Sequence, residues 1–212
     1  MEKEKILEIL KKLKAEKKRF VQSIELVITL KGIDTKKQNV DVSIVLPHKV
    51  KDRKICLFAE KSVLGADKIF DKVILKEQFA NYDKKKAKKL AKEFDFFVSQ
   101  ASLMASVASA FGKVLGPAGK MPSPTNGSII IKTDEKFLKE TIEKLSKTIR
   151  AKTTKNDTSL KFIVGHQKMP DKEISENIHV VEENLINKLP KGQENIKNIL
   201  IKTTMGKPIK IN

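Results

Sequence analysis

The chain has 212 residues, 40% of them apolar, which is enough for one large domain or two small ones with buried cores. Its 44 lysines and arginines outnumber 26 aspartates and glutamates, and the formal net charge of +18 favours a polyanionic partner, either nucleic acid or an anionic membrane surface. The sequence contains no run of about 18 uncharged apolar residues, the length needed to span a bilayer. We also expect no signal peptide. The single cysteine, Cys56, excludes an internal disulfide and fits a reducing cytoplasm.

The first sixty residues predict one helix followed by three strands. Apolar residues at helical spacing predict an amphipathic helix over 1–18. From Phe20 the apolar period changes to two, which predicts strands at 20–30, 40–46 and 54–59, the first two separated by a turn at 32–39. Three strands with hairpin-like turns suggest an antiparallel sheet.

The middle of the chain alternates short apolar strands with helical segments. Strands are expected at 72–76 and 94–98, and helices are expected through Ala87 and Ala91, over 103–111 and over 134–147. This rhythm predicts a small parallel sheet covered by helices.

The C-terminal third returns to hairpin-like strands. Strands are expected at 149–154, 160–165, 198–204 and 208–211, with a turn at 155–159 and a helix over 171–189. Because the two ends resemble each other and the middle does not, we predict an α+β protein in two parts. Residues 1–59 plus 157–212 would form one discontinuous domain, with 60–156 inserted into it as an α/β domain.

Two motifs that could carry enzymatic chemistry fail on inspection. In GPAGK (116–120) only Pro117 and Ala118 separate the glycine from the GK pair, whereas a phosphate-binding loop needs four residues there and a hydroxyl after the lysine. This segment is either a structural loop or an RNA-facing one. The three histidines, His48, His166 and His179, lie far apart and match no metal-ligand spacing or nucleophile motif. We therefore expect no enzyme activity, no metal and no cofactor.

The segment DKKKAKKLAK (83–92) is the most basic run of the chain. Charge runs of this kind are usually solvated helix faces. Lysines also attract phosphate at long range without a specific pose. Both interpretations stay open.

Two further segments carry residue types suited to RNA. Arg19 and Phe20 pair a charge with a ring that could stack on a base, although a core phenylalanine is an equal alternative. Glu25 would repel phosphate unless it accepts a hydrogen bond from RNA or orients a cation. Near the end, Thr203 and Thr204 could bond phosphate or a ribose 2′-hydroxyl, Met205 could pack on a base or sugar, and Gly206 would allow a backbone to come close. A plain β-turn is the alternative.

Four segments together resemble the L-one family of large-subunit ribosomal proteins. They are RFVQSIEL with LKGID after it (19–34), LGPAGKMPSP (115–124), VGHQKM (164–169) and KTTMGKP (202–208). Their order and spacing match that family over nearly the whole chain, and LPH (46–48) is similar to its archaeal branch.

The resemblance implies a discontinuous domain that binds large-subunit rRNA at the base of a mobile lateral stalk, and a Rossmann-like inserted domain that uses no dinucleotide. It further implies contact of the stalk with exit-site tRNA, participation in the release of deacylated tRNA, and repression of translation of the protein's own mRNA. The chain would act as a monomer within the ribosome, in the cytoplasm, without a membrane partner.

The RNA-contact positions of the family carry over to both ends of this sequence. The candidate RNA-binding residues are Arg19, Phe20, Ser23, Glu25, Gly165, Asn198, Thr203, Thr204, Met205 and Gly206. Gly165 and Thr203 match the family pattern more loosely, and Asn198 falls where some members have serine. Ala118 stands where the family often has arginine, and Lys49 to Asp52 replace a common Gly–Arg–Gly–Lys segment. These departures weaken the expectation of phosphate contacts by those two loops.

Overall fold

The computed structural model describes residues 3–15, 18–33, 40–61, 65–131, 134–154 and 157–211. The chain divides into two compact units, which we call the terminal domain (1–51 with 147–212) and the inserted domain (52–146). The terminal domain is built around antiparallel strands and the inserted domain around a parallel sheet, so the predicted α+β fold class is confirmed.

The terminal domain takes its elements from both ends of the chain. They are α1 (Lys3–Ala15), β1 (Ser23–Leu30), β2 (Asp41–Val45), β7 (Thr148–Lys152), β8 (Ser159–His166), α6 (Asp171–Lys188), the 3₁₀ helix η4 (Gly192–Asn195), β9 (Ile196–Thr203) and β10 (Ile209–Lys210). Four of the strands form an antiparallel sheet in the order β10-β9-β1-β8.

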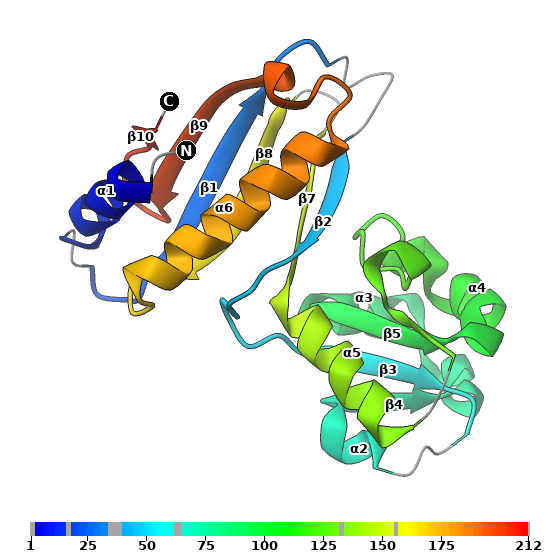
Figure 1. The fold of residues 1–212 in the computed structure, drawn as a ribbon. Coiled ribbons are helices and arrows are strands. Elements are labelled where there is room, and N and C mark those ends of the chain that lie inside the picture. The colour runs from blue at the N-terminus through cyan, green and yellow to red at the C-terminus, as the bar shows by residue number, and fades with distance from the viewer. Residues whose placement is uncertain are drawn as a thin grey trace. The chain divides into compact units, whose positions relative to one another are not determined.

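Helices α1 and α6 cover one face of this sheet (Figure 1). Strand β1 alternates between buried and half-buried residues, because successive side chains of a strand point to opposite faces. Its buried residues, Ile24, Leu26, Ile28 and Leu30, join the core beneath the helices. The alternate residues, from Ser23 to Thr29, lie on the opposite face, which we call the open face.

Strands β2 and β7 form a separate antiparallel ribbon, in which Val45 is the partner of Thr148. The segment after β2 is fixed to the terminal domain by Asn177 of α6. The Asn177 side chain accepts a hydrogen bond from the His48 N–H (3.1 Å) and donates to the carbonyls of His48 (3.2 Å) and Val164 (2.9 Å). Asn177 is fully buried, so these bonds satisfy polar groups that have no access to water.

The inserted domain alternates strands and helices. Its elements are β3 (Ile55–Ala59), α2 (Ala66–Ile69), β4 (Lys72–Leu75), η1 (Lys76–Asn81), α3 (Lys84–Glu93), β5 (Phe96–Gln100), η2 (Ala101–Leu103), α4 (Met104–Leu115), η3 (Pro124–Asn126), β6 (Ile129–Ile130) and α5 (Glu135–Lys147). The parallel sheet has the order β4-β3-β5-β6, the start of a doubly wound arrangement. The Rossmann-like expectation is thereby confirmed.

Two apolar cores lie on the two faces of the parallel sheet. Helices α3 and α4 pack on one face against Phe58 and Phe97, and α2 and α5 pack on the other against Leu57 and Val98. Strand β3 is central, and all five of its residues are buried because both of its faces are covered.

The predicted strand pairing at the N-terminus was wrong. Strand β3 was assigned to the antiparallel sheet, whereas it pairs in parallel with β4 and β5 in the inserted domain. Strand β7, assigned to the inserted domain, pairs instead with β2. The predicted boundaries, 1–59 with 157–212 and 60–156, therefore differ from the compact units at these two strands. The turns expected at 32–39 and 155–159 lie largely outside the described residues.

Candidate nucleic-acid interface

The candidate RNA-binding residues from the two ends of the chain meet at one end of the terminal sheet. There β1 begins while β8 and β9 end, because both neighbours run antiparallel to it. Ser23 is the partner of His166 in β8, and Ile24 is the partner of Thr203 in β9. We call this region the sheet end. It joins segments that are separated by most of the sequence.

Four hydrogen bonds donated by backbone N–H groups fix the geometry of the sheet end. The Thr204 N–H donates to the Ser23 carbonyl at 3.1 Å, and the Ser23 N–H donates to Thr204 Oγ1 at 3.2 Å. The Met205 N–H donates to Gln22 Oε1 at 3.0 Å, and the Gly206 N–H donates to the Thr203 carbonyl at 3.1 Å. Segment 203–206 is therefore a rigid turn rather than a loose tail.

Two apolar side chains project from the sheet end into solvent. Met205 is 68% exposed and Phe20 is 52% exposed, although both are large enough to be favourable in a core. Phe20 precedes β1, which begins only at Ser23, so its interpretation as a core residue is wrong and it remains available for stacking. Arg19 is exposed beside it. Both side chains are therefore accessible to a partner.

Glu25 lies on the open face next to a lysine that the sequence did not single out. It is the β9 partner of Lys202, and Lys202 Nζ lies 3.1 Å from Glu25 Oε2. Of the two functions considered for this carboxylate, orienting a cation is thus realised in the free protein. Asn198 is paired with Thr29, two rows further along the same face, so it lies away from the sheet end.

Gly165 and Thr203 have a different environment from the other candidates. A Cβ atom added to Gly165 would lie 2.7 Å from Cγ1 of Ile174 in α6, so the absence of a side chain allows the helix to pack closely. Thr203 is fully buried, and its hydroxyl has no hydrogen-bond partner among the residues described. Packing explains Gly165 without any RNA contact, and Thr203 could reach RNA only through a change in its surroundings.

Sequence reasoning missed three polar residues at the sheet end. Besides Lys202, these are Gln22, which is fully buried and holds the Met205 N–H, and His166, the partner of Ser23. Within the described residues, His166 Nδ1 and Gln22 Nε2 are buried without a hydrogen-bond partner. The VGHQKM motif contained the signal for His166, but no local pattern indicated that it would face Ser23.

The glycine- and proline-rich segment 112–127 has a structural explanation in the inserted domain. Lys120 Nζ donates to the carbonyls of Ala91 and Phe94, both at 2.8 Å, at the C-terminal end of α3. An ammonium group is favourable there because the last carbonyls of a helix lack partners and carry partial negative charge. Met121 packs against the adjoining core. The lysine of GPAGK therefore caps a helix.

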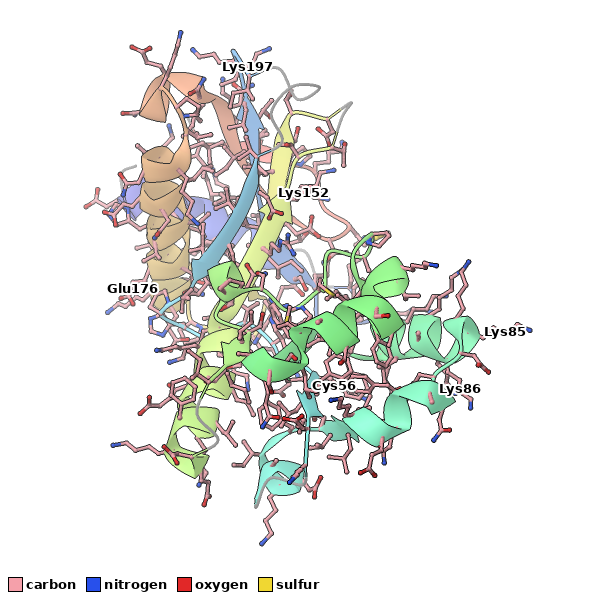
Figure 2. The ribbon with its side chains drawn as sticks, turned by 90° about the vertical axis from the view of Figure 1, so that its right-hand side faces the viewer. Cys56, Lys85, Lys86, Lys152, Glu176 and Lys197 are labelled. Carbon is pink, nitrogen blue, oxygen red and sulfur yellow. The ribbon has the colours of Figure 1, made fainter. Side chains whose placement is uncertain are left out.

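Other chemistry is not indicated in the part of the chain that is described. Its residues contain no group of three or more histidine, cysteine, aspartate or glutamate side chains that could hold a metal ion. Cys56, labelled in Figure 2, is fully buried, and burial raises the pKa of its thiol to about 12, so it stays protonated and unreactive at neutral pH. None of the described helices is both long and apolar enough to cross a membrane.

Comparison with known proteins agrees with the geometry of the sheet end. Residues 10–207 match the model of the ribosomal protein L1p/L10e family. Among similar proteins, the large ribosomal subunit protein uL1 of Pyrococcus abyssi is 38% identical, over 99% of this chain and 96% of the relative. The protein of the same name from Nanoarchaeum equitans is 37% identical over 92% of this chain and 93% of the relative. That from Methanocaldococcus jannaschii is 34% identical over 100% of this chain and 96% of the relative. With a match that spans both domains, and with the motifs RFVQSIEL, VGHQKM and KTTMGKP gathered at one end of the terminal sheet, the chain belongs to the ribosomal protein L1p/L10e family, a family of ribosomal proteins and not of enzymes.

Proposed function

We propose that this protein is a structural constituent of the large ribosomal subunit that binds rRNA through the sheet end and the adjoining open face. The observation that carries the proposal is the convergence of Phe20, Ser23, Glu25, Thr204 and Met205 on one rigid surface. These residues come from the two most distant parts of the chain. The relatives are named as proteins of the large ribosomal subunit, which fits this surface.

The chemistry of the sheet end suits a folded RNA. Exposed Phe20 and Met205 can pack on a base or a sugar, and the Thr204 hydroxyl can bond a ribose 2′-hydroxyl. Lys18, Lys202 and Lys207 flank this small uncharged cluster in the sequence, and phosphate contacts from lysines position a protein without reading sequence. We therefore assign selectivity to the cluster and long-range attraction to the lysines.

The family resemblance extends the proposal in two directions. The rRNA segment bound would form the mobile lateral stalk near the tRNA exit site, where the protein would assist the release of deacylated tRNA. The same surface would bind a similar fold in the protein's own mRNA and repress its translation. Both activities require the sheet end, so its substitution is expected to impair them together.

The first test is the salt dependence of binding to an rRNA stalk fragment. A footprint of about 6 to 10 phosphates loses on the order of a thousandfold or more in affinity between low and moderate salt. The +18 charge predicts a dependence of this kind. Filter binding with the stalk fragment over a salt series measures the slope, and a nearly flat profile would remove the electrostatic part of the proposal.

A further inference from the structure

The inserted domain carries a hollow that has no part in the proposed rRNA site. It lies between β4, η1 and α3, and it is lined by Lys72, Val73, Gln78, Asn81, Tyr82, Lys86, Lys89, Leu90 and Glu93. Its volume of about 570 Å³ is within the range of sites that hold small ligands, about 300–1,000 Å³. We call it the α3 hollow.

The α3 hollow combines positive charge with an aromatic ring. Three lysines face a single acidic residue, Glu93, so the lining is net positive. Lys72 Nζ lies 5.8 Å from the centroid of the Tyr82 ring, and Lys86 Nζ donates to the Asn81 carbonyl at 3.0 Å. Neither Lys72 nor Lys89 forms an ion pair with any of the residues described, so their charges are available to an anion.

The ring and one carboxamide in the hollow are held in place. Tyr82 packs against Phe111 of α4 with the ring centroids 5.6 Å apart, and Phe111 is fully buried in the core. Gln78 Oε1 accepts a hydrogen bond from the Leu75 N–H at 3.2 Å, which leaves the Gln78 amide group free to donate. The hollow therefore offers a fixed ring, an oriented carboxamide and cationic side chains.

We propose that the α3 hollow binds one ribonucleotide unit of single-stranded RNA, as a site beyond the proposed rRNA interface. Lys72, Lys86 and Lys89 contact the phosphate, and the base stacks on Tyr82 as the phosphate draws the Lys72 ammonium away from the ring. Gln78 and Asn81 bond the base edge, since carboxamides both donate and accept. Glu93 accepts a hydrogen bond from a ribose hydroxyl or an exocyclic amine.

The composition of the lining favours a nucleotide over an acidic peptide. A carboxylate needs only cations, and it would gain nothing from an aromatic ring beside two carboxamides. Helix α3 also extends the positive surface beyond the hollow, because Lys84, Lys85, Lys88 and Lys92 are exposed along it; Lys85 and Lys86 are labelled in Figure 2. A positive track with an aromatic platform is the usual form of a single-strand site.

The test measures binding of fluorescent octauridylate to the full chain by anisotropy. The double variant Lys72→Gln/Lys89→Gln removes two cations from the hollow, and Lys85→Gln/Lys88→Gln removes two cations from the same basic region outside it. We expect the first to lose at least about tenfold in affinity and the second less than about threefold. Equal losses of affinity in the two variants would overturn the proposal, because the lysines of α3 would then attract RNA through charge alone, without a defined binding site.

Variants of Tyr82 distinguish the contribution of base stacking to affinity from the contribution of charge. Tyr82→Leu is expected to lose at least about fivefold for octauridylate and to leave tripolyphosphate binding unchanged, and Tyr82→Phe is expected to retain both because it keeps the ring on Phe111. If Tyr82→Leu does not weaken octauridylate binding in folded protein, the base-stacking part is wrong.

Two further arms distinguish the source of the ligand. If uridine monophosphate binds and the same variants weaken its binding, the site is supported and its ligand is a free nucleotide. Weak binding of the monophosphate supports an RNA strand as the ligand. Displacement of octauridylate by hexaglutamate at equal concentration would overturn the choice of RNA. Affinity for the rRNA stalk fragment should stay unchanged in Tyr82→Leu and Tyr82→Phe, which alter no charge, so this proposal and the rRNA proposal fail independently.

Discussion

The two domains use positive charge in different ways. In the terminal domain, lysines such as Lys202 pair with an acidic residue beside a rigid uncharged turn, so the sheet end is specified by shape and hydrogen bonds. In the inserted domain, α3 carries exposed lysines at almost every outward position, with no acidic residue in its first turn. Net charge alone would have pointed to α3 as the binding site. On our proposal, the charge of α3 supplies general attraction to RNA, whereas the fixed polar geometry of the sheet end supplies selectivity.

The largest expected difference between the domains is in affinity for the rRNA stalk fragment. Residues 1–51 joined to 147–212 by a short linker should bind it. The Leu46 N–H, a few residues before the first cut, bonds the Lys147 carbonyl at 3.0 Å, so a short linker can join the two ends. The isolated inserted domain, 52–146, should bind at least about a thousandfold more weakly, as for non-specific binding. Gel-shift titration measures both, and equal affinities would place the site in the wrong domain.

Removal of the Lys120 helix cap should lower the stability of the inserted domain without changing the affinity for rRNA. Lys120→Met leaves the carbonyls of Ala91 and Phe94 without their charged donor, and should lower the stability of that domain by about 1.5–3 kcal/mol. Lys113→Met, on an exposed position of α4, is the matched control and should have little effect. Denaturant melts measure stability, and stalk-fragment affinity should not change. A loss of rRNA affinity in stably folded Lys120→Met would mean that segment 112–127 faces RNA.

Gly165→Ala should test whether this glycine serves packing in the terminal domain. The added Cβ would meet Ile174 at 2.7 Å, and overpacking of this kind costs about 1–3 kcal/mol. Gly112→Ala is the control, since a Cβ there meets nothing within 4 Å and alanine favours the α4 helix. Ile174→Ala combined with Gly165→Ala should show coupling in thermal melts. Additive effects of the two substitutions would argue against a packing role.

The sequence predicted the elements better than their partners. The alternation of buried residues in β1 follows directly from its apolar pattern, and the long amphipathic pattern of α6 identified that helix almost to its ends. Alternation tells which residues share a face, but it does not tell which strand lies alongside. Strand β1 pairs with β8 and β9 from the opposite end of the chain, and no local signal contains that information.

The sequence of β3 contains a signal that indicates its correct sheet. The run Ile55–Ala59 is continuously apolar rather than alternating, which is typical of a strand buried on both faces in a parallel sheet. Strand β6 has only two residues and helix α2 only four, too short for any periodicity. At the sheet end, the family motifs indicated Thr204 and Met205. The Glu25–Lys202 pair and the position of His166 depended on strand register, which only the fold supplies.

The smallest expected effect concerns the hydroxyl of Thr204, and it tests the comparison most sharply. In the free protein Thr204 Oγ1 accepts a hydrogen bond from the Ser23 N–H at 3.2 Å and donates a long one, 3.4 Å, to the Ser23 carbonyl. An RNA acceptor would take the hydroxyl proton in place of that long bond. Thr204→Val keeps the shape and removes the hydroxyl, and Thr204→Ser keeps the hydroxyl. We expect Thr204→Val to lose about 0.5–1.5 kcal/mol of binding to the stalk fragment, and Thr204→Ser to retain it.

The informative quantity is the ratio of affinities for the stalk fragment and a scrambled RNA of equal length. Thr204→Val should lower this ratio by about two- to twelvefold, because ribose and base contacts select a fold. Replacement of Lys84, Lys85 and Lys88 together should weaken both RNAs and leave the ratio nearly unchanged, because phosphate contacts position without selecting. Melting curves must first show that Thr204→Val is folded, since the Ser23 N–H loses its partner. A folded Thr204→Val with an unchanged ratio would reduce segment 203–206 to a structural turn, and selectivity would have to come from Phe20 and Met205.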